Sequence, residues 1–100
     1  MPAPDKSFVL VIYFANQRYR LTCEQIGTGI AVDTWEIRAK NKTLVFDNNK
    51  PRMDRARLEH MPWTWTLIKG EMHNVNLQHA IVQALEARIR GKGGSPLYPV

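Results

Sequence analysis

The segment SFVLVIYFA, from Ser7 to Ala15, constrains the fold more than any other part of this sequence. Its β-branched and aromatic residues favour an extended strand. A strand with one face in water alternates apolar and polar residues, whereas an unbroken apolar run is typical of a strand covered on both faces. The sequence therefore predicts an N-terminal strand with two apolar faces, each of which needs a packing partner.

The same segment is not expected to enter a membrane. The apolar run FVLVIYFA has eight residues, whereas a helix that spans a bilayer needs about 20. Asp5 precedes the run, and the following ANQRYR has no small-residue cleavage site of the kind that ends a signal peptide. We predict a soluble, cytoplasmic protein with no membrane partner.

The next segments alternate with a period of two residues, as strands do when one face meets water. They cover residues 18–26, 31–40, 43–47 and 63–68. Asn16-Gln17 is a candidate two-residue turn between the first two strands. A change of parity between Val32 and Trp35 indicates a bulge near Asp33-Thr34. The predicted inward-facing side chains are those of Tyr19, Leu21, Trp35, Ile37, Leu44, Phe46 and Trp65.

Helical periodicity is clearest near the C-terminus, where apolar residues recur at i, i+4 spacing. The stripe comprises Leu77, Ala80, Ile81, Ala84, Leu85 and Ile89. Asn74 or Asn76 can cap the first turn, and Gly91 is well placed to end the helix. Glu86 and Arg90 form an i, i+4 pair of opposite charge. We predict one helix whose apolar stripe covers the sheet.

These elements predict an α+β fold, in which an antiparallel meander sheet of four to five strands is packed by one C-terminal α-helix. The predicted single domain spans residues 7–91. Residues 1–6 are predicted to be a disordered N-terminus and residues 92–100 a flexible C-terminal tail, because both are rich in Pro or Gly. Within the domain, residues 48–62 are predicted to form a long basic loop or a short helix that begins at Pro51.

One helix can cover only one face of a sheet, and the first strand has a second apolar face. The residues predicted on this second face are Val9, Val11, Tyr13, Val45 and Ile68. Either the 48–62 segment folds over this face through Met53, Leu58 and Met61, or a second copy of the chain packs there. Large exposed apolar patches are uncommon on monomers, so we predict self-association, with coverage by the loop as the alternative.

The formal net charge of +5 at pH 7 favours polyanionic partners, such as single-stranded nucleic acid or an acidic protein. Cations on the outward parity of adjacent strands could join those of the 48–62 segment in one basic surface, beside a tryptophan that stacks on bases. The candidate contacts are Arg18, Arg20, Arg38, Lys40, Lys42, Lys50, Arg52, Arg55, Arg57 and Trp63. The alternative is that these charges keep the strands soluble and discourage edge pairing.

Few residues are suited to catalysis or metal binding. Cys23 is the single cysteine, and its parity places it in the core, where a thiol is inert. His60, His73 and His79 lack the short spacing that preorganises a zinc site. The sequence has no pattern of a catalytic centre or a phosphate-binding loop, so we predict a protein that is not an enzyme and has no cofactor.

The closing segment WTWTLIKGEMHNVNLQHAIVQALEARI joins a tryptophan-containing strand, a turn with Gly70 and a capped helix. In this layout, over residues 8–90, the chain resembles small uncharacterised bacterial proteins that have a β-meander followed by a C-terminal helix. It is also similar in layout to the whirly and positive-cofactor-like single-stranded DNA binders, whose subunits have four strands and a helix and which dimerise. The resemblance implies a fold and brings no catalytic residues with it.

Together these observations predict a small non-enzymatic interaction domain that forms a homodimer. The alternative is a protein that binds single-stranded nucleic acid through a basic face of the sheet and the 48–62 loop. The two hypotheses depend on different surfaces: the apolar second face of the first strand in one case, and the cations of the later strands and the loop in the other.

Overall fold

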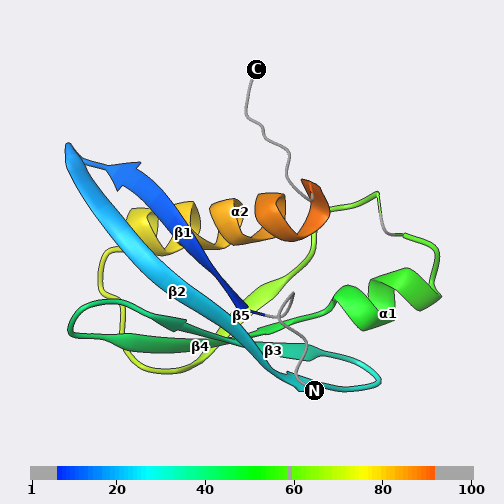
Figure 1. The fold of residues 1–100 in the computed structure, drawn as a ribbon. Coiled ribbons are helices and arrows are strands. Elements are labelled where there is room, and N and C mark those ends of the chain that lie inside the picture. The colour runs from blue at the N-terminus through cyan, green and yellow to red at the C-terminus, as the bar shows by residue number, and fades with distance from the viewer. Residues whose placement is uncertain (1–6, 59, 92–100) are drawn as a thin grey trace.

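The computed structural model describes residues 7–58 and 60–91. It confirms the predicted α+β class, because five antiparallel strands form one open meander sheet and a C-terminal helix packs against it (Figure 1). The predicted N-terminal segment 1–6 and tail 92–100 lie outside the described residues. The elements are β1 (Ser7–Phe14), β2 (Gln17–Thr28), β3 (Asp33–Arg38), β4 (Thr43–Asn48), α1 (Lys50–Arg55), β5 (Trp65–Lys69) and α2 (Val75–Gly91).

The β1–β2 hairpin turns one residue earlier than predicted. Phe14 pairs with Gln17, so the loop consists of Ala15 and Asn16, whose φ angles are 52° and 65°. Two successive positive φ angles are typical of a type I′ turn, whose twist matches that of the flanking strands. The prediction of a turn at Asn16-Gln17 was therefore wrong, because the register that pairs the apolar residues of β1 with β2 closes the hairpin before Gln17.

The predicted bulge lies on the facing strand. Along β2 the register with β3 shifts between Gln25 and Gly27, so Ile26 has no pairing partner on β3. This extra residue lets Trp35 of β3 pair with Gln25 on the inner face. The parity change in the sequence therefore marked the correct place in the sheet but the wrong strand.

The core lies between one face of the sheet, called here the inner face, and α2. The buried cluster comprises Leu10, Ile12, Leu21, Cys23, Trp35, Ile37, Leu44, Phe46, Ile81 and Leu85. Tyr19 and Trp65, also predicted to face inward, pack partly buried against it. At the start of α2, Asn74 Oδ1 accepts the Leu77 N–H at 3.0 Å, which is the predicted N-cap. Helix and sheet thus bury one continuous apolar layer, which drives folding.

The 48–62 segment contains a short helix, α1, with Pro51 in its first turn as predicted. This helix lies on the same side of the sheet as α2, because Pro51 and Ile89 line one hollow together with Trp35. Leu58 and Met61, which were expected to cover the second face of β1, are themselves 38% and 44% exposed. The alternative in which this segment covers the second face was therefore wrong.

The turn after β5 depends on a glycine. Gly70 has a φ of +91°, and a Cβ added to it would meet the carbonyl oxygen of Thr43 and lie 3.0 Å from Leu44 Cδ2. We expect Gly70→Ala to lower the free energy of unfolding by about 2 kcal/mol or more, because the positive φ alone costs an L-residue about 1–2 kcal/mol. Urea unfolding followed by tryptophan fluorescence measures this loss.

Gly91→Ala is the matched control, since a Cβ at Gly91 would have no atom within 4 Å. It should leave stability unchanged or raise it slightly, because alanine favours helix over glycine. Equal effects of the two substitutions would contradict the assignment of strain to Gly70.

Candidate interaction surface

β1 is an edge strand whose free side is apolar and uncharged. It pairs with β2 alone among the described strands. Its eight residues include no charged residue and no proline, which are the devices that usually protect an exposed edge from pairing. On the face away from α2, called here the outer face, Val9, Val11 and Tyr13 are 41%, 42% and 74% exposed. The second apolar face of β1, predicted to need a partner, is thus open to solvent in the single chain.

The opposite edge of the sheet is protected. β5 has only five residues and ends at Lys69. Its register with β4 shifts between Val45 and Phe46, so that Val45 pairs with Lys69 and Phe46 with Leu67, and Ile68 is left over. A short strand, an irregular register and a lysine all discourage pairing with a further strand. Of the two edges, β1 is therefore better suited to pairing with a further strand.

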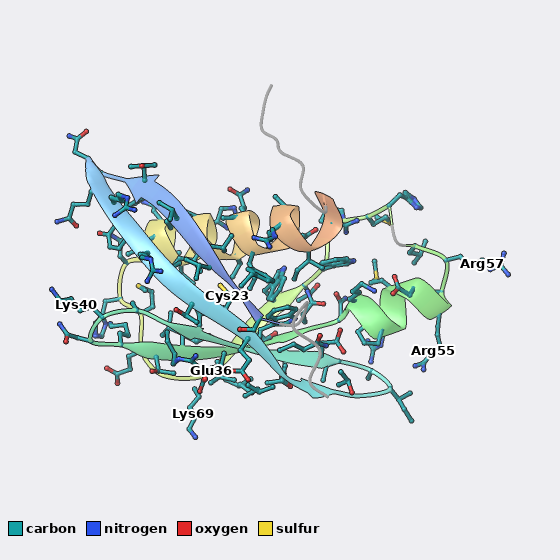
Figure 2. All side chains as sticks on the ribbon, in the orientation of Figure 1. Cys23, Glu36, Lys40, Arg55, Arg57 and Lys69 are labelled. Atoms are coloured by element: carbon teal, nitrogen blue, oxygen red, sulfur yellow. The ribbon has the colours of Figure 1, made fainter. Side chains whose placement is uncertain are left out.

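The outer face between the two edges is charged. Opposite Val11 and Tyr13 in the β1–β2 register lie Arg20 and Arg18, and β2 and β3 add Glu24, Glu36 and Arg38. Val45, which was predicted to lie on this second face, is only 6% exposed, and its pairing partners are Glu36 and Lys69. In Figure 2 the Glu36 and Lys69 side chains point away from α2. The exposed apolar side chains of this face thus lie mainly on the two edge strands, β1 and β5.

An ion-pair group lies at the centre of the outer face. Nη1 of Arg38 donates to Glu36 Oε1 and to Glu24 Oε1, the latter at 3.3 Å. These hydrogen bonds, with Glu36 first and Glu24 second, raise the pKa of the Arg38 guanidinium above its ordinary value. Two carboxylates therefore engage the positive charge of Arg38, whose side chain remains 43% exposed.

The ten predicted nucleic-acid contacts do not lie on one surface. Three share the outer face, namely Arg18, Arg20 and Arg38. Lys40 and Lys42 belong to the β3–β4 turn, and Lys50, Arg52 and Arg55 to α1, with Arg57 just beyond it. Figure 2 shows Lys40 at one end of the molecule and Arg55 and Arg57 at the other. The structure therefore places only the first three on the outer face.

Two cations of α1 are bonded within the chain. Lys50 Nζ lies 2.6 Å from Asp54 Oδ2, one helical turn along. Arg55 Nη2 donates to the backbone carbonyl of Ile30 at 2.7 Å, which ties α1 to the β2–β3 turn. Arg55, one of the cations of the predicted basic loop, thus holds this segment against the sheet.

Trp63, the predicted stacking residue, is a buried side chain. It is 8% exposed, and the guanidinium of Arg90 lies over its ring, 4.1 Å from the centroid. Its ring also packs at 6.4 Å from that of Trp65. An exposed aromatic side chain on the outer face is instead that of Tyr13.

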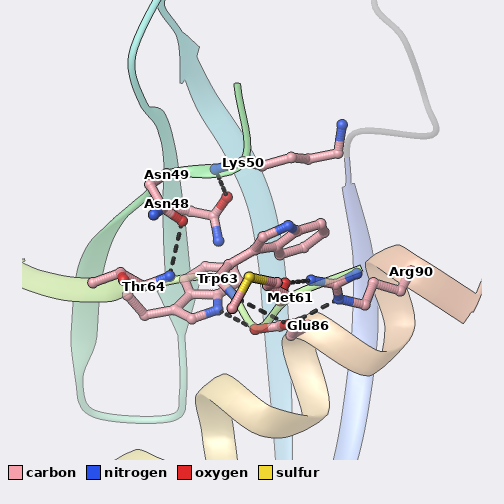
Figure 3. Close-up of polar contacts among 9 residues, drawn as sticks. Asn48, Asn49, Lys50, Met61, Trp63, Thr64, Glu86 and Arg90 are labelled. Carbon is pink, nitrogen blue, oxygen red and sulfur yellow. Dashed lines mark hydrogen bonds and ion pairs between the residues drawn. The ribbon is translucent and has the colours of Figure 1, made fainter. Parts of the chain in front are cut away.

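Glu86 of α2 organises the surroundings of Trp63, which the sequence did not predict. Its Oε2 accepts the Trp63 N–H at 3.3 Å and Arg90 Nε–H at 2.8 Å. Its Oε1 accepts Trp65 Nε1–H at 2.9 Å. Arg90 in turn donates through Nη2 to the Met61 carbonyl at 2.5 Å. Figure 3 shows Glu86 and Arg90 together, with Arg90 in contact with Met61, so that both residues of α2 attach the segment before β5 to the helix.

We expect Glu86→Ala to lower the free energy of unfolding by about 2–4 kcal/mol, because the Trp63 N–H, the Trp65 Nε1–H and the Arg90 Nε–H all lose this acceptor. Glu71→Ala is the control, since that side chain is 83% exposed and the change should stay within about 0.5 kcal/mol. Chemical unfolding of both variants tests this, and similar stabilities of the two would argue against the role of Glu86.

Cys23 is a core residue, as its parity predicted. It is fully buried, and burial raises the pKa of its thiol from 9.0 to about 12, an effect that Arg88 and Arg38 only partly oppose. A thiol that keeps its proton throughout the physiological range is not activated as a nucleophile. The geometry therefore gives no support to covalent catalysis at Cys23.

The raised pKa of Cys23 predicts a loss of stability in alkali. The folded state keeps a proton that the unfolded chain releases above about pH 9, so the free energy of unfolding falls as the pH rises from about 9 to 12. This group should contribute a loss of about 1 kcal/mol between pH 9 and pH 10. Urea unfolding at the two pH values measures it, and Cys23→Ala should lack this part of the decline. An identical decline in both proteins would refute it.

Residues 7–58 and 60–91 contain no group of three or more His, Cys, Asp or Glu side chains that could hold a metal ion. In the same part of the chain, no helix has the length and apolar character needed to cross a membrane.

Comparisons with protein-family models, with curated proteins and with solved structures found no match. The edge of β1 and the charged outer face are therefore the features from which a function can be inferred.

Proposed function

We propose that this protein is a non-enzymatic interaction domain that forms a homodimer through β1. In the dimer the two β1 strands lie antiparallel, edge to edge, and the two sheets become one. The observation that supports this most directly is the open edge, where eight residues without charge or proline expose Val9, Val11 and Tyr13. Every second residue of an edge strand directs its N–H and C=O groups outward, and a second strand satisfies them.

Pairing through the edge is favoured over stacking through the outer face. Two stacked sheets would bury the Arg38 group with Glu24 and Glu36, and desolvation of such charges opposes association. Edge pairing leaves these charges in water. It also gives Val9 and Val11 apolar cross-strand neighbours from the second β1, and such pairs stabilise a sheet.

A second copy is the partner that fits best, because the edge is complementary to itself. A two-fold axis places the same apolar strand on both sides of the interface, with no charge to be matched. A hetero-partner such as an acidic protein would gain nothing from the cationic character of the chain at this strand. The pairing requires only backbone groups and apolar side chains, which each copy supplies.

Single-stranded nucleic acid is the alternative partner. One observation favours it: Tyr13, which is 74% exposed, lies opposite Arg18 on the outer face, and Arg20 is two residues further along β2. An aromatic ring beside two arginines can hold a base and its phosphates. The burial of Trp63 and the separation of the other cations leave this group small.

We expect the wild-type protein to have the mass of a dimer in size-exclusion chromatography with light scattering over the micromolar range. Val11→Lys should give a monomer, because it places a charge at the centre of the paired edge. Ile68→Lys is the matched control, since Ile68 is also exposed on a strand, at 53%, but belongs to the opposite edge. It should remain dimeric, and circular dichroism should show that both variants are folded.

A wild-type mass of one chain throughout this range would overturn the proposal, as would a dimer that survives Val11→Lys. Binding of a single-stranded oligonucleotide that weakens steeply with salt, and that Arg18→Ala with Arg20→Ala reduces, would instead favour the alternative. Slower hydrogen exchange of the β1 amides at high protein concentration would place the contact at this strand.

A further inference from the structure

A cavity of about 200 Å³ lies on the other side of the sheet, between the inner face and the first half of α2. Its walls come from β2, β3 and β4, from the β5–α2 loop and from the helix. Six apolar side chains form them: Leu21, Ile37, Leu44, Met72, Leu77 and Ile81. Close-packed interiors seldom leave voids larger than a water molecule, so an apolar space of this size is suited to a guest.

The cavity arises from the unequal lengths of β2 and β3. Thr22 pairs with Arg38, the last residue of β3, so the part of β2 before Thr22 has β1 as its only strand partner. Figure 1 shows the β1–β2 and β3–β4 hairpins spreading apart on the side where α2 begins. Tyr19 of β2 and Ala39 and Lys42 of the β3–β4 turn line the cavity on this side. The opening is thus a consequence of strand lengths that the sequence specifies.

The polar groups at this opening favour an anion. Lys42 Nζ donates to the backbone carbonyl of Glu71 at 2.9 Å, which holds the ammonium between the β3–β4 turn and the β5–α2 loop. An ammonium carries three N–H groups, so it can keep this bond and also donate to a carboxylate. None of the described residues that line the cavity is acidic. The hydroxyl of Tyr19 is directed to Gln17 Oε1 at 2.7 Å.

We propose that this cavity binds a small carboxylic acid with an apolar body. The body lies between α2 and the sheet, and the carboxylate pairs with Lys42. A dry cavity of about 150 Å³ accommodates a benzene molecule, so the space fits a body of about eight carbon atoms. Met72, an unbranched and adaptable side chain from the β5–α2 loop, can adjust its conformation around the guest. This site is independent of the proposed dimer contact, which uses the edge and the outer face of β1.

Octanoate is the probe, with octan-1-ol and octylamine as the same chain bearing a neutral and a cationic head group. Isothermal titration calorimetry with the full chain should give the tightest binding for octanoate, weaker binding for octan-1-ol and the weakest for octylamine. Lys42→Met should weaken octanoate binding by about tenfold and leave octan-1-ol unchanged, because only the acid uses the charge-assisted hydrogen bond. Lys42 is exposed, so this variant should fold.

A second variant tests the cavity itself. Leu77→Trp places a larger side chain in the space and should abolish binding of both octanoate and octan-1-ol, whereas Val75→Trp, at a helix position that is 73% exposed, should bind both normally. No binding of octanoate or octan-1-ol to the wild-type protein would overturn the proposal. Equal affinity for the acid and the amine, or an octanoate affinity that Lys42→Met does not change, would overturn the assignment of the head group to Lys42.

Discussion

The structure depends on one constraint: a single long helix has to cover one face of a five-stranded sheet. The inner face meets this requirement with a continuous apolar layer from Leu10 on β1 to Leu85 on α2. The outer face has no such cover among the described residues, and charged side chains occupy most of it. β1 does not follow this division, because its outer residues are apolar as well. The candidate interaction surface is therefore β1, whose outer residues are apolar, whereas most outer residues of β2 and β3 are polar or charged.

The helix is attached unevenly, and this explains two other features. More of the α2 backbone lies near β1 than near any other strand, so the far side of the sheet needs a separate attachment. The Glu86 carboxylate supplies it, because it joins the Trp63 backbone and the Trp65 indole to the second half of the helix. Among residues 7–58 and 60–91, no comparable carboxylate joins the first half of α2 to the sheet, and this half lies over the region where the two hairpins diverge. The Glu86 contacts at the second half of α2 and the apolar cavity at its first half therefore have one cause, the uneven packing of the helix on the sheet.

The sequence predicted the fold well, because period-two and i, i+4 patterns report directly on which face each residue takes. The Asn74 cap and the Glu86–Arg90 pair were predicted because both are local. The position of the 48–62 segment was not, since its short helix has no buried residue to reveal a packing face. The sequence pattern also did not reveal the acceptor of the Trp63 N–H, which lies 23 residues away at Glu86. Composition also could not predict which cations form hydrogen bonds within the chain. Their acceptors can lie in turns that are distant in the sequence, as the Ile30 carbonyl is for Arg55.

The irregular end of β5 gains importance beside the open edge of β1. In the dimer that we propose, the merged sheet would end on both sides in β5, with its unpaired Ile68 and its Lys69. Neither flank offers a straight, uncharged template to a third chain. Growth would then stop at two subunits. The sheet would associate through β1, and the irregular β5 edge would disfavour fibre formation.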